Sequence, residues 1–389
     1  MSVWITTENI SDEAWRLLLE FANIDFAFAE ISKKHGTPEN NSVQENYKKQ
    51  AEQIRVSILQ SKEYFDAAVS ASLFTSPNHL YYGMVALASA IMLLNGSGEQ
   101  SLDRLRIDPR NRSHGLNFKT GVTKNDCHHG LSILGKSFVE VAPTGFFLNW
   151  YKTLPLDYSN YAVIKRREEG VIVHRRQKAG AEKIRQANRM VGTKSPLLNL
   201  LSRLPDMYGS LNRYGHPVVA SRADYGITVD MYAKVTTHEW RIHGAPSPQG
   251  LYAILQNFKL PYSVSQFWKI TDYENKTGCI VTFAVPHTIG TVNFQWPSVR
   301  EDLNNESIIY SEYIDTHEIV DGYRAAYGLS MLSRYYPDLW IRCLDSHCMA
   351  AKAIEHFVFV MTRKFLLMSL QHLAGGDFVI SNHIAPWYH

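Results

Sequence analysis

The sequence predicts a mainly α-helical protein with a β-containing insert, an α+β fold. Apolar residues recur at spacings of three and four in roughly the first hundred residues, and the same period returns after about residue 311. Between these regions the pattern changes to strict alternation, which is typical of half-buried strands. A chain of 389 residues with 45% hydrophobic and 12% aromatic residues is long and apolar enough to form an ordered core.

The first helical pattern begins at Asp12. Apolar side chains then recur on one face at Trp15, Leu19, Ala22, Phe26 and Ala29. We therefore expect one amphipathic helix from Asp12 to about Lys34, and Gly36 ends it.

The next helix has a sequence signature at its start. Ser42 and Glu45 fit the capping box, in which each side chain bonds a backbone N–H of the first turn. A long apolar stripe follows, at Tyr47, Ala51, Ile54, Ile58, Ser61, Phe65, Ala68 and Ser72. Pro77 and Asn78 then reset the chain, and a buried helix rich in small residues is expected over Leu80 to Leu94.

The middle of the chain mixes short helices with strands. Residues 130–141, GLSILGKSFVEV, are expected to be helical, and so is Ser195 to Leu211. A strand is expected where Ile227, Val229, Met231, Ala233 and Val235 alternate. Residues 266–273 and 279–285 are expected to form a β-hairpin. Residues 237–250, THEWRIHGAPSPQG, are expected to form a loop.

These patterns divide the chain into four expected regions. Residues 1–160 form an N-terminal helical bundle, 161–225 a basic connector with short helices, 226–305 the β-containing insert and 306–389 the C-terminal helices. Within the last region, Pro337 is expected to begin a new helix onto which Trp340 packs back.

Composition and the first residues indicate the compartment. The four cysteines are too few and too irregularly spaced for a disulfide framework, which favours a reducing, cytoplasmic location. The opening MSVWITTENISDEAW is acidic and polar, unlike a signal peptide. The longest apolar run, Leu80 to Leu94, is shorter than a bilayer requires, so no membrane association is expected. A net charge of +3 is mildly basic and is by itself only weak evidence of a polyanion partner.

Several blocks of the sequence, in order, resemble the YaaC-like proteins of bacteria. They are residues 80–96 (LYYGMVALASAIMLLNG), 113–116 (SHGL), 130–147 (GLSILGKSFVEVAPTGFF), 195–208 (SPLLNLLSRLPDMY) and 329–340 (LSMLSRYYPDLW). The blocks are scattered over most of the chain. This resemblance implies no particular chemistry.

The N-terminal half is also similar, more loosely, to HEPN helical domains. Tyr81 and Tyr82, with the small residues that follow them, match one element of those domains. His129-Gly130 and the run Gly135 to Phe138 match another, a histidine-glycine step and a short helix. The HEPN resemblance implies a helical bundle, often dimeric, and an RNA-cleaving or nucleotide-binding role.

Catalytic HEPN domains pair an arginine with a histidine and have four to six residues between them, so that both side chains reach one phosphate. Two pairs here have this spacing, Arg342 with His347 and Arg167 with His174, which is no more than chance predicts. The second pair runs through a Gly-Val-Ile-Val segment that is typical of a strand. Arg110 and His114 are closer in sequence, and on a helix they would share one face. The candidate catalytic residues are therefore Arg110, His114, Arg342 and His347.

A basic block from Lys165 to Arg189 suggests a contact with a polyanion. It holds nine basic and three acidic residues, so it is either a solvated surface segment or a phosphate-binding patch. Arg334, beside two tyrosines, either packs structurally or binds a phosphate while a tyrosine stacks on a base. The candidate nucleic-acid-binding residues are Lys165, Arg166, Arg167, Arg175, Arg176 and Arg334.

The sequence predicts no metal site and no cofactor. Cys127, His128 and His129 are adjacent, so at most two of them could readily reach one ion, and His114 would have to complete the site from a distance. Cys343, His347 and Cys348 lack a second pair to complete a tetrad. Metal-dependent hydrolysis through His114, His128 and His129 remains an alternative.

Two classes of function are consistent with these observations. The first is a nucleic-acid-directed protein that acts on RNA or DNA, an RNase-type effector in phage defence or a toxin-like system. The second is a non-catalytic scaffold or regulatory subunit, which forms a homo-oligomer or docks on a partner protein.

Overall fold

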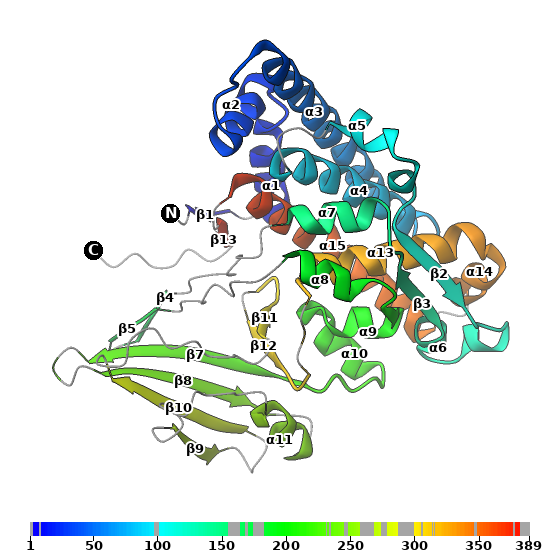
Figure 1. Cartoon of the computed structure of the whole chain (residues 1–389). Coiled ribbons are helices and arrows are strands. Elements are labelled where there is room, and N and C mark those ends of the chain that lie inside the picture. Colours follow the sequence, from blue (N-terminus) through cyan, green and yellow to red (C-terminus); the bar gives the residue numbers. More distant parts are fainter. Residues whose placement is uncertain are drawn as a thin grey trace. The chain divides into compact units, whose positions relative to one another are not determined.

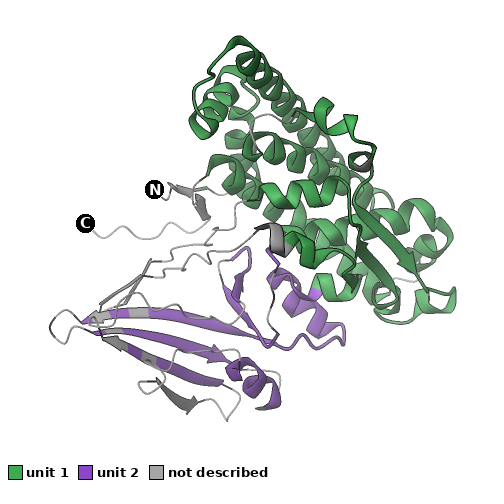
Figure 2. Ribbon diagram, in the orientation of Figure 1, with its two compact units in different colours: residues 1–158, 178–201, 319–389 green, residues 159–177, 202–318 purple. Residues whose placement is uncertain are grey.

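The computed structural model folds into two compact units (Figure 1). Unit 1 comprises residues 1–158, 178–201 and 319–389, and unit 2 comprises residues 159–177 and 202–318 (Figure 2). The structure describes residues 3–7, 9–96, 101–154, 164–167, 170–173, 183–230, 232, 235–244, 248–256, 268–273, 278–286, 299–304, 306–312, 314, 316–345, 348–375 and 378–381. The fold is mainly α with a β-containing region, as the sequence predicts.

Unit 1 begins with two short helices where the sequence predicts one. Helix α1 spans Ile10–Glu20 and α2 spans Ile24–His35. The single-helix prediction is wrong because Asn23 caps a new helix. Its side chain accepts hydrogen bonds from the backbone N–H groups of Asp25 and Phe26. Gly36, at φ +96°, ends α2 as expected.

Two long helices follow, α3 (Asn41–Ser70) and α4 (Ser76–Asn95). The predicted capping box is displaced, because Asn40 rather than Ser42 caps α3 by accepting from Val43 N–H at 3.0 Å. The buried stripe of α3 runs from Tyr47 to Ala68 as predicted. A Cβ at Gly83 would lie 2.6 Å from the Phe65 ring, so the small residue brings α4 close to α3.

The C-terminal helices complete unit 1. They are α13 (Glu318–Tyr335), which enters unit 1 at Ile319, α14 (Pro337–Asp345) and α15 (Met349–Ala374), and α15 packs against α1 and α4. Pro337 begins α14, and the Trp340 Nε1–H donates to the Phe74 carbonyl at 3.0 Å, which confirms the prediction for this block. Strands β1 (Val3–Thr6) and β13 (Phe378–Ser381) pair in parallel and join the two ends of the described chain.

A small antiparallel sheet lies beside these helices in unit 1. It has the order β2 (Leu116–Thr120), β3 (Ser137–Val141) and β6 (Lys194–Pro196). Residues 130–141 are therefore helical only over α6 (Ser132–Gly135), and the prediction of a helix across this segment is wrong after Lys136. Alternate side chains of Ser137–Val141 are buried, so a strand period follows the short helix.

Short helices connect the parts of unit 1. They are α5 (Leu102–Ile107), the 3-10 helices η1 (Pro109–Arg112) and η2 (Asn125–His128), α7 (Phe146–Thr153), α8 (Lys183–Met190) and α9 (Leu197–Ser202). The expected single helix from Ser195 to Leu211 is divided, since β6 precedes α9 and the chain continues in unit 2 as η3 (Pro205–Met207) and α10 (Tyr208–Arg213).

Unit 2 is built on a six-stranded antiparallel sheet, ordered β11-β12-β7-β8-β10-β9. The strands are β7 (Ala220–Asp230), β8 (Val235–His243), β9 (Trp268–Tyr273), β10 (Gly278–Pro286), β11 (Val299–Glu301) and β12 (Ser307–Tyr310). Tyr225, Trp240, Ile242 and Val281 on this sheet pack with Leu251 and Ile254 of α11 (Pro248–Gln256). A separate hairpin joins β4 (Ile164–Arg167) to β5 (Gly170–Val173).

Two predictions for this sheet need correction. Val235 does not continue the strand of Ile227, because β7 ends at Asp230 and β8 begins at Val235. Thr237 to His243 form β8 rather than a loop, since Trp240 and Ile242 alternate with polar residues and only the apolar pair faces the core. The predicted hairpin is confirmed, with Tyr273 opposite Gly278.

In the described part of the chain, no helix combines the length and apolar character that a bilayer crossing requires.

Candidate functional site

His114 is held in place by a close approach of two backbone segments. It lies between the end of η1 at Arg112 and the start of β2 at Leu116. Phe146 N–H donates to the Ser113 carbonyl at 2.9 Å, and Phe147 N–H donates to the His114 carbonyl at 3.0 Å. A Cβ at Gly145 would collide with the Gly115 Cα, so glycine permits this contact. The backbone of His114 is therefore fixed on both sides.

The imidazole of His114 is also fixed, by a buried tyrosine. The Tyr81 hydroxyl of α4 lies 2.9 Å from His114 Nδ1, and the two rings meet edge to face at 5.6 Å. Tyr327 of α13 packs against both rings, and its hydroxyl donates to the Leu116 carbonyl at 2.7 Å. The hydrogen bond with Tyr81 thus involves Nδ1 of His114, and Nε2 is the other nitrogen of the ring.

The environment of this pair sets its protonation. Burial, followed by the positive charge of Arg334, lowers the pKa of His114, so the imidazole is neutral at pH 7. Burial, followed by the neighbouring Tyr323, raises the pKa of Tyr81 well above its ordinary value. A protonated tyrosine therefore faces a neutral histidine.

Arg334 lies beside the same cluster, from the last turn of α13. Its guanidinium donates to the Tyr82 hydroxyl and lies over the rings of Tyr82 and Tyr335, at 5.3 and 5.1 Å from their centroids. Tyr82 also stacks on Tyr64 at 5.7 Å. Tyr335 is 63% exposed, so a cation and an accessible aromatic face lie next to each other.

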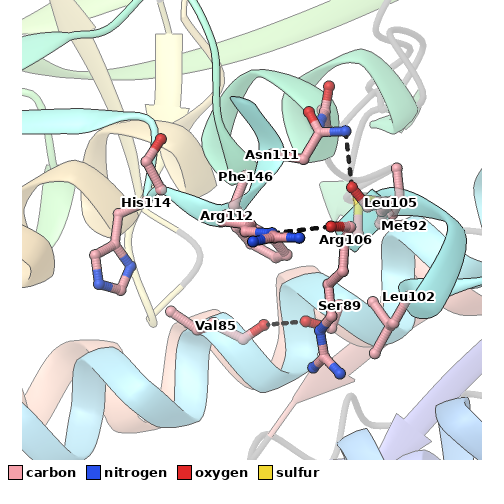
Figure 3. Close-up of a pocket in the computed structure, with 12 residues that line it drawn as sticks. Val85, Ser89, Met92, Leu102, Leu105, Arg106, Asn111, Arg112, His114 and Phe146 are labelled. Carbon is pink, nitrogen blue, oxygen red and sulfur yellow. Dashed lines mark hydrogen bonds between the residues drawn. The ribbon is translucent and has the colours of Figure 1, made fainter. Parts of the chain in front are cut away.

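A cavity of about 510 Å³ lies beside His114, which is one of its lining residues (Figure 3). Its polar wall includes two arginines and no acidic residue, and it consists of Arg106, Asn111, Arg112, Ser113, His114 and Asn149, with Ser89 opposite. Its apolar wall is formed by Val85, Met92, Leu102, Leu105 and Phe146. Such a volume, with both kinds of lining, suits a small organic anion or one nucleotide unit.

The arginines of this cavity are only partly engaged by the protein. Arg112 Nε donates to the Arg106 carbonyl at 3.0 Å, which orients its guanidinium (Figure 3). Asn111 donates through Nδ2 to the Leu105 carbonyl, and its Oδ1 accepts a hydrogen bond from Asn149 Nδ2. Within the described ranges, Arg106 and Arg112 form no ion pair with an acidic side chain. Lys49 and, to a smaller extent, Arg106 lower the pKa of Asp103, so Arg106 lies near an acidic side chain without an ion pair. Arg112 is therefore the less engaged of the two cations.

The predicted catalytic pairs have different outcomes. The 3-10 helix that contains Arg110 ends at Arg112, so the helical face that would join Arg110 to His114 does not exist. The side chain of Arg110 lies outside the described residues. Arg342 is exposed in the last turn of α14, and His347 lies outside the described residues.

The predicted basic block lies mostly outside the described side chains. Lys165, Arg166 and Arg167 are in β4, whose backbone alone is described, and Arg175 and Arg176 fall outside the described residues. The segment before His174, predicted as a strand, is β5.

The alternative metal site has no geometric support. His128 and His129 are exposed, whereas Cys127 is buried and its thiol points to the carbonyls of Leu339 and Thr123. Where the structure describes side chains, no three His, Cys, Asp or Glu residues are arranged to hold a metal ion.

Sequence reasoning missed Arg106 and Arg112, and it missed the role of Tyr81 as the partner of His114. The local sequence does indicate the two arginines, because Arg106 and Arg112 lie on either side of Arg110 and close to His114. The hydrogen bond of Tyr81 to His114 spans 33 residues, and no local spacing indicates it.

The blocks that carry the family resemblance meet at this site. Tyr81 comes from the first block, His114 from the second, Phe146 and Phe147 from the third and Arg334 from the last. A family model described as YaaC-like protein matches residues 21–373. The chain belongs to the YaaC-like family. The comparisons with curated proteins and with solved structures each found no match.

The YaaC-like match begins just after α1, extends from α2 to α15 and includes residues of both compact units. It supports the resemblance stated for most of the chain and gives no separate support to the HEPN resemblance. One HEPN-like element differs from expectation, since Gly135 ends α6 and Ser137 and Phe138 lie in β3.

Proposed function

We propose that this YaaC-like protein is nucleic-acid-directed and that it binds and cleaves single-stranded RNA at the cavity beside His114. The observation that supports this proposal best is the neutral His114, fixed at Nδ1 by Tyr81, in the wall of a cavity that also holds Arg106 and Arg112. A neutral imidazole can act as the general base in metal-independent phosphodiester cleavage, and guanidinium groups can stabilise the charge that develops on the phosphate.

The two arginines favour a phosphate as the anion. Guanidinium groups bind phosphate oxygens through several N–H donors in one plane. The apolar wall from Val85 to Phe146 accepts a ribose or a base, which a free inorganic anion would leave empty. A nucleotide unit of a longer strand satisfies both walls.

The reaction follows from these groups. His114 Nε2 accepts the proton of a ribose 2′-hydroxyl, and the 2′-oxygen attacks the adjacent phosphorus. The bond from phosphorus to the 5′-oxygen breaks, and that oxygen takes a proton from water. The hydroxide that remains takes the proton from His114 Nε2, which returns the imidazole to its neutral form. Arg106 and Arg112 stabilise the negative charge on the phosphate oxygens as it develops. The products are a 2′,3′-cyclic phosphate and a free 5′-hydroxyl.

The remaining candidate residues extend this proposal along the strand. Arg334 with Tyr335 offers a cation and an exposed ring on which a base can stack. Lys165, Arg166, Arg167, Arg175 and Arg176 are proposed to contact backbone phosphates. Arg110, and the pair Arg342 with His347, remain candidates for a second phosphate contact.

The test uses the full-length protein with end-labelled single-stranded RNA in a low-salt buffer that contains EDTA. We expect cleavage that leaves cyclic phosphate ends and that is absent on DNA of the same sequence, because DNA lacks the 2′-hydroxyl. The proposal is wrong if the protein neither binds nor cuts RNA under these conditions.

A growth assay tests the biological setting, an effector in phage defence or a toxin-like system. Expression of the wild-type chain in bacteria is expected to slow growth, and expression of His114→Ala is not. Equal growth of both strains, at equal protein levels, would argue against a toxin-like effector.

A second candidate function is a scaffold that self-associates or docks on a partner protein. It is favoured by exposed apolar residues of α14 and α15, namely Ile341, Met349 and Phe359. Ile341 also lines a cavity of about 360 Å³ between residues 72–74, α14 and α15. Light scattering of the wild type and of Phe359→Asp tests self-association, and a monomer in both cases removes the homo-oligomer.

A further inference from the structure

Three of the four cysteines gather in unit 1, although the sequence separates one of them widely from the others. Cys127 is in η2, Cys343 is near the end of α14, and Cys348 is the N-cap residue of α15. No disulfide joins these four described cysteines, and Cys279 belongs to the sheet of unit 2. The thiols of Cys127, Cys343 and Cys348 are close enough to influence one another electrostatically.

Cys343 and Cys348 are the closest pair of this cluster. Their sulfur atoms lie 3.3 Å apart, and the Cys348 thiol is also 3.3 Å from the Cys343 carbonyl. A disulfide requires a sulfur separation of about 2.0 Å, so an approach of little more than one ångström joins them. The end of one helix and the start of the next thus present two thiols in contact.

The two thiols differ in access. Cys343 is fully buried, whereas Cys348 is only partly buried. A low-molecular-weight reagent therefore reaches the Cys348 sulfur more easily than the Cys343 sulfur. Their mutual hydrogen bond, followed by burial, raises the pKa of Cys343. Because reaction at Cys348 removes that hydrogen bond, Cys343 becomes more reactive only after Cys348 has reacted.

We propose that Cys343 and Cys348 are a redox-modification site, a dithiol that a low-molecular-weight disulfide such as oxidised glutathione converts reversibly to an intramolecular disulfide.

The reaction balances in two exchange steps. The Cys348 thiolate attacks one sulfur of the oxidised glutathione, which forms a mixed disulfide and releases one reduced glutathione. The Cys343 thiolate then attacks the Cys348 sulfur, forms the Cys343–Cys348 disulfide and releases the second glutathione. The protein loses two electrons and two protons, and the glutathione disulfide is reduced by the two electrons.

The chain offers a direct readout of this reaction. Trypsin cuts after Arg342 and after Lys352, so both cysteines fall in one peptide, residues 343–352. Cys127 and Cys279 fall in two other peptides and serve as internal controls. The full-length protein is equilibrated with defined ratios of oxidised to reduced glutathione, acid-quenched, labelled with N-ethylmaleimide, digested and analysed by mass spectrometry.

We expect peptide 343–352 to lose both maleimide labels and the mass of two hydrogens, while the Cys279 peptide keeps its label. Cysteines five residues apart also react in an unfolded chain, so the same titration in denaturant is the reference. The folded protein is expected to form the disulfide at about a tenfold lower ratio of oxidised to reduced glutathione. A folded protein that needs an equal or higher ratio contradicts the proposal.

Variants separate the two steps. Cys343→Ser is expected to accumulate glutathione on Cys348, and Cys348→Ser is expected to leave Cys343 unmodified. Cys127→Ser is expected to leave the titration unchanged. A disulfide that links the Cys127 peptide to peptide 343–352 would instead assign the pair to Cys127, and retention of both labels at all ratios would remove the site.

Discussion

Each compact unit contains a tyrosine hydroxyl that bonds Nδ1 of a histidine, yet the two pairs lie in different surroundings. In unit 1, Tyr81 lies 2.9 Å from His114, between a helix and an irregular loop. In unit 2, Tyr225 lies 2.6 Å from His238, across neighbouring strands β7 and β8. Both histidines have a pKa lowered first by burial. The local bond is therefore the same in the two units.

The difference lies in what each histidine faces. His114 is a lining residue of a cavity that also contains two arginines, and a third arginine, Arg334, acts on it electrostatically. The Tyr225 ring stacks on Trp240 at a centroid distance of 4.5 Å, on the sheet face that α11 covers. A tyrosine–histidine bond by itself thus indicates no function. The groups around the second ring nitrogen decide whether the histidine has chemistry to perform.

The largest expected effect comes from removing each imidazole. We expect His114→Ala to reduce RNA cleavage by about 10²- to 10⁴-fold, the range for loss of a general base. His238→Ala is expected to leave the cleavage rate within about twofold, because it lies outside the arginine-lined cavity. The measurement is the single-turnover rate with labelled RNA. An equal loss of cleavage rate in both variants would mean that the rate falls because the protein is less stable, and not because a catalytic group is missing.

The next effect concerns the backbone near each pair. Gly145 has φ +124° and contacts Gly115, whereas Gly244, after β8, has φ +53° and open space around it. We expect Gly145→Ala to lower the free energy of unfolding by about 4 kcal/mol, from backbone strain plus steric overlap. Gly244→Ala is expected to cost about 1 kcal/mol. Urea denaturation followed by circular dichroism measures both, and equal midpoints would show that the Gly115–Gly145 contact relaxes freely.

The helices of this fold were predictable because their apolar periodicity is long and regular. Their boundaries were less so, because Asn9, Asn23 and Asn40 cap α1, α2 and α3 through side-chain oxygens. Asparagine is also common in turns, so its presence alone does not indicate the start of a helix. Where Asn23 breaks one apolar stripe into two helices, the stripe itself continues and conceals the break.

Strand β8 and the partners of His114 were missed for different reasons. In β8 the histidines His238 and His243 made the alternation look polar, although Trp240 and Ile242 face the core. In the site, His114 was a candidate from its sequence context alone. Its partners lie 33 residues away at Tyr81 and far along the chain at Arg334, so only tertiary packing brings them together.

A smaller effect is expected from pH, and unit 2 provides the sharper test. Burial lowers the pKa of His238 to about 4 from 6.5. The unfolded chain therefore binds a proton between pH 6.5 and 4 that the folded chain does not, so stability from this group is present above pH 6.5 and is lost as pH falls toward 4. The expected loss is about 2 to 3 kcal/mol. His114, also shifted downward, acts in the same direction.

The matched variant for this prediction is His238→Gln, which cannot titrate. The urea midpoint of the wild type, compared with that of His238→Gln, is expected to fall more steeply between pH 6.5 and pH 4.5. Parallel curves for the two proteins would show that His238 titrates alike in the folded and unfolded chains, and the burial argument would then be wrong for both pairs.

The smallest expected effect separates the two tyrosine–histidine bonds directly. Tyr81→Phe and Tyr225→Phe each remove one hydroxyl and are each expected to lower the free energy of unfolding by about 1 kcal/mol. Only Tyr81→Phe is expected to slow RNA cleavage, by about tenfold, because the His114 imidazole loses the group that orients it. Its KM is expected to stay unchanged, since Arg106 and Arg112 still bind the phosphate. If Tyr81→Phe instead cleaves at the wild-type rate while its stability falls, the bond to His114 is structural in both units, and orientation of Nε2 must come from the backbone hydrogen bonds around Gly115 and Phe147.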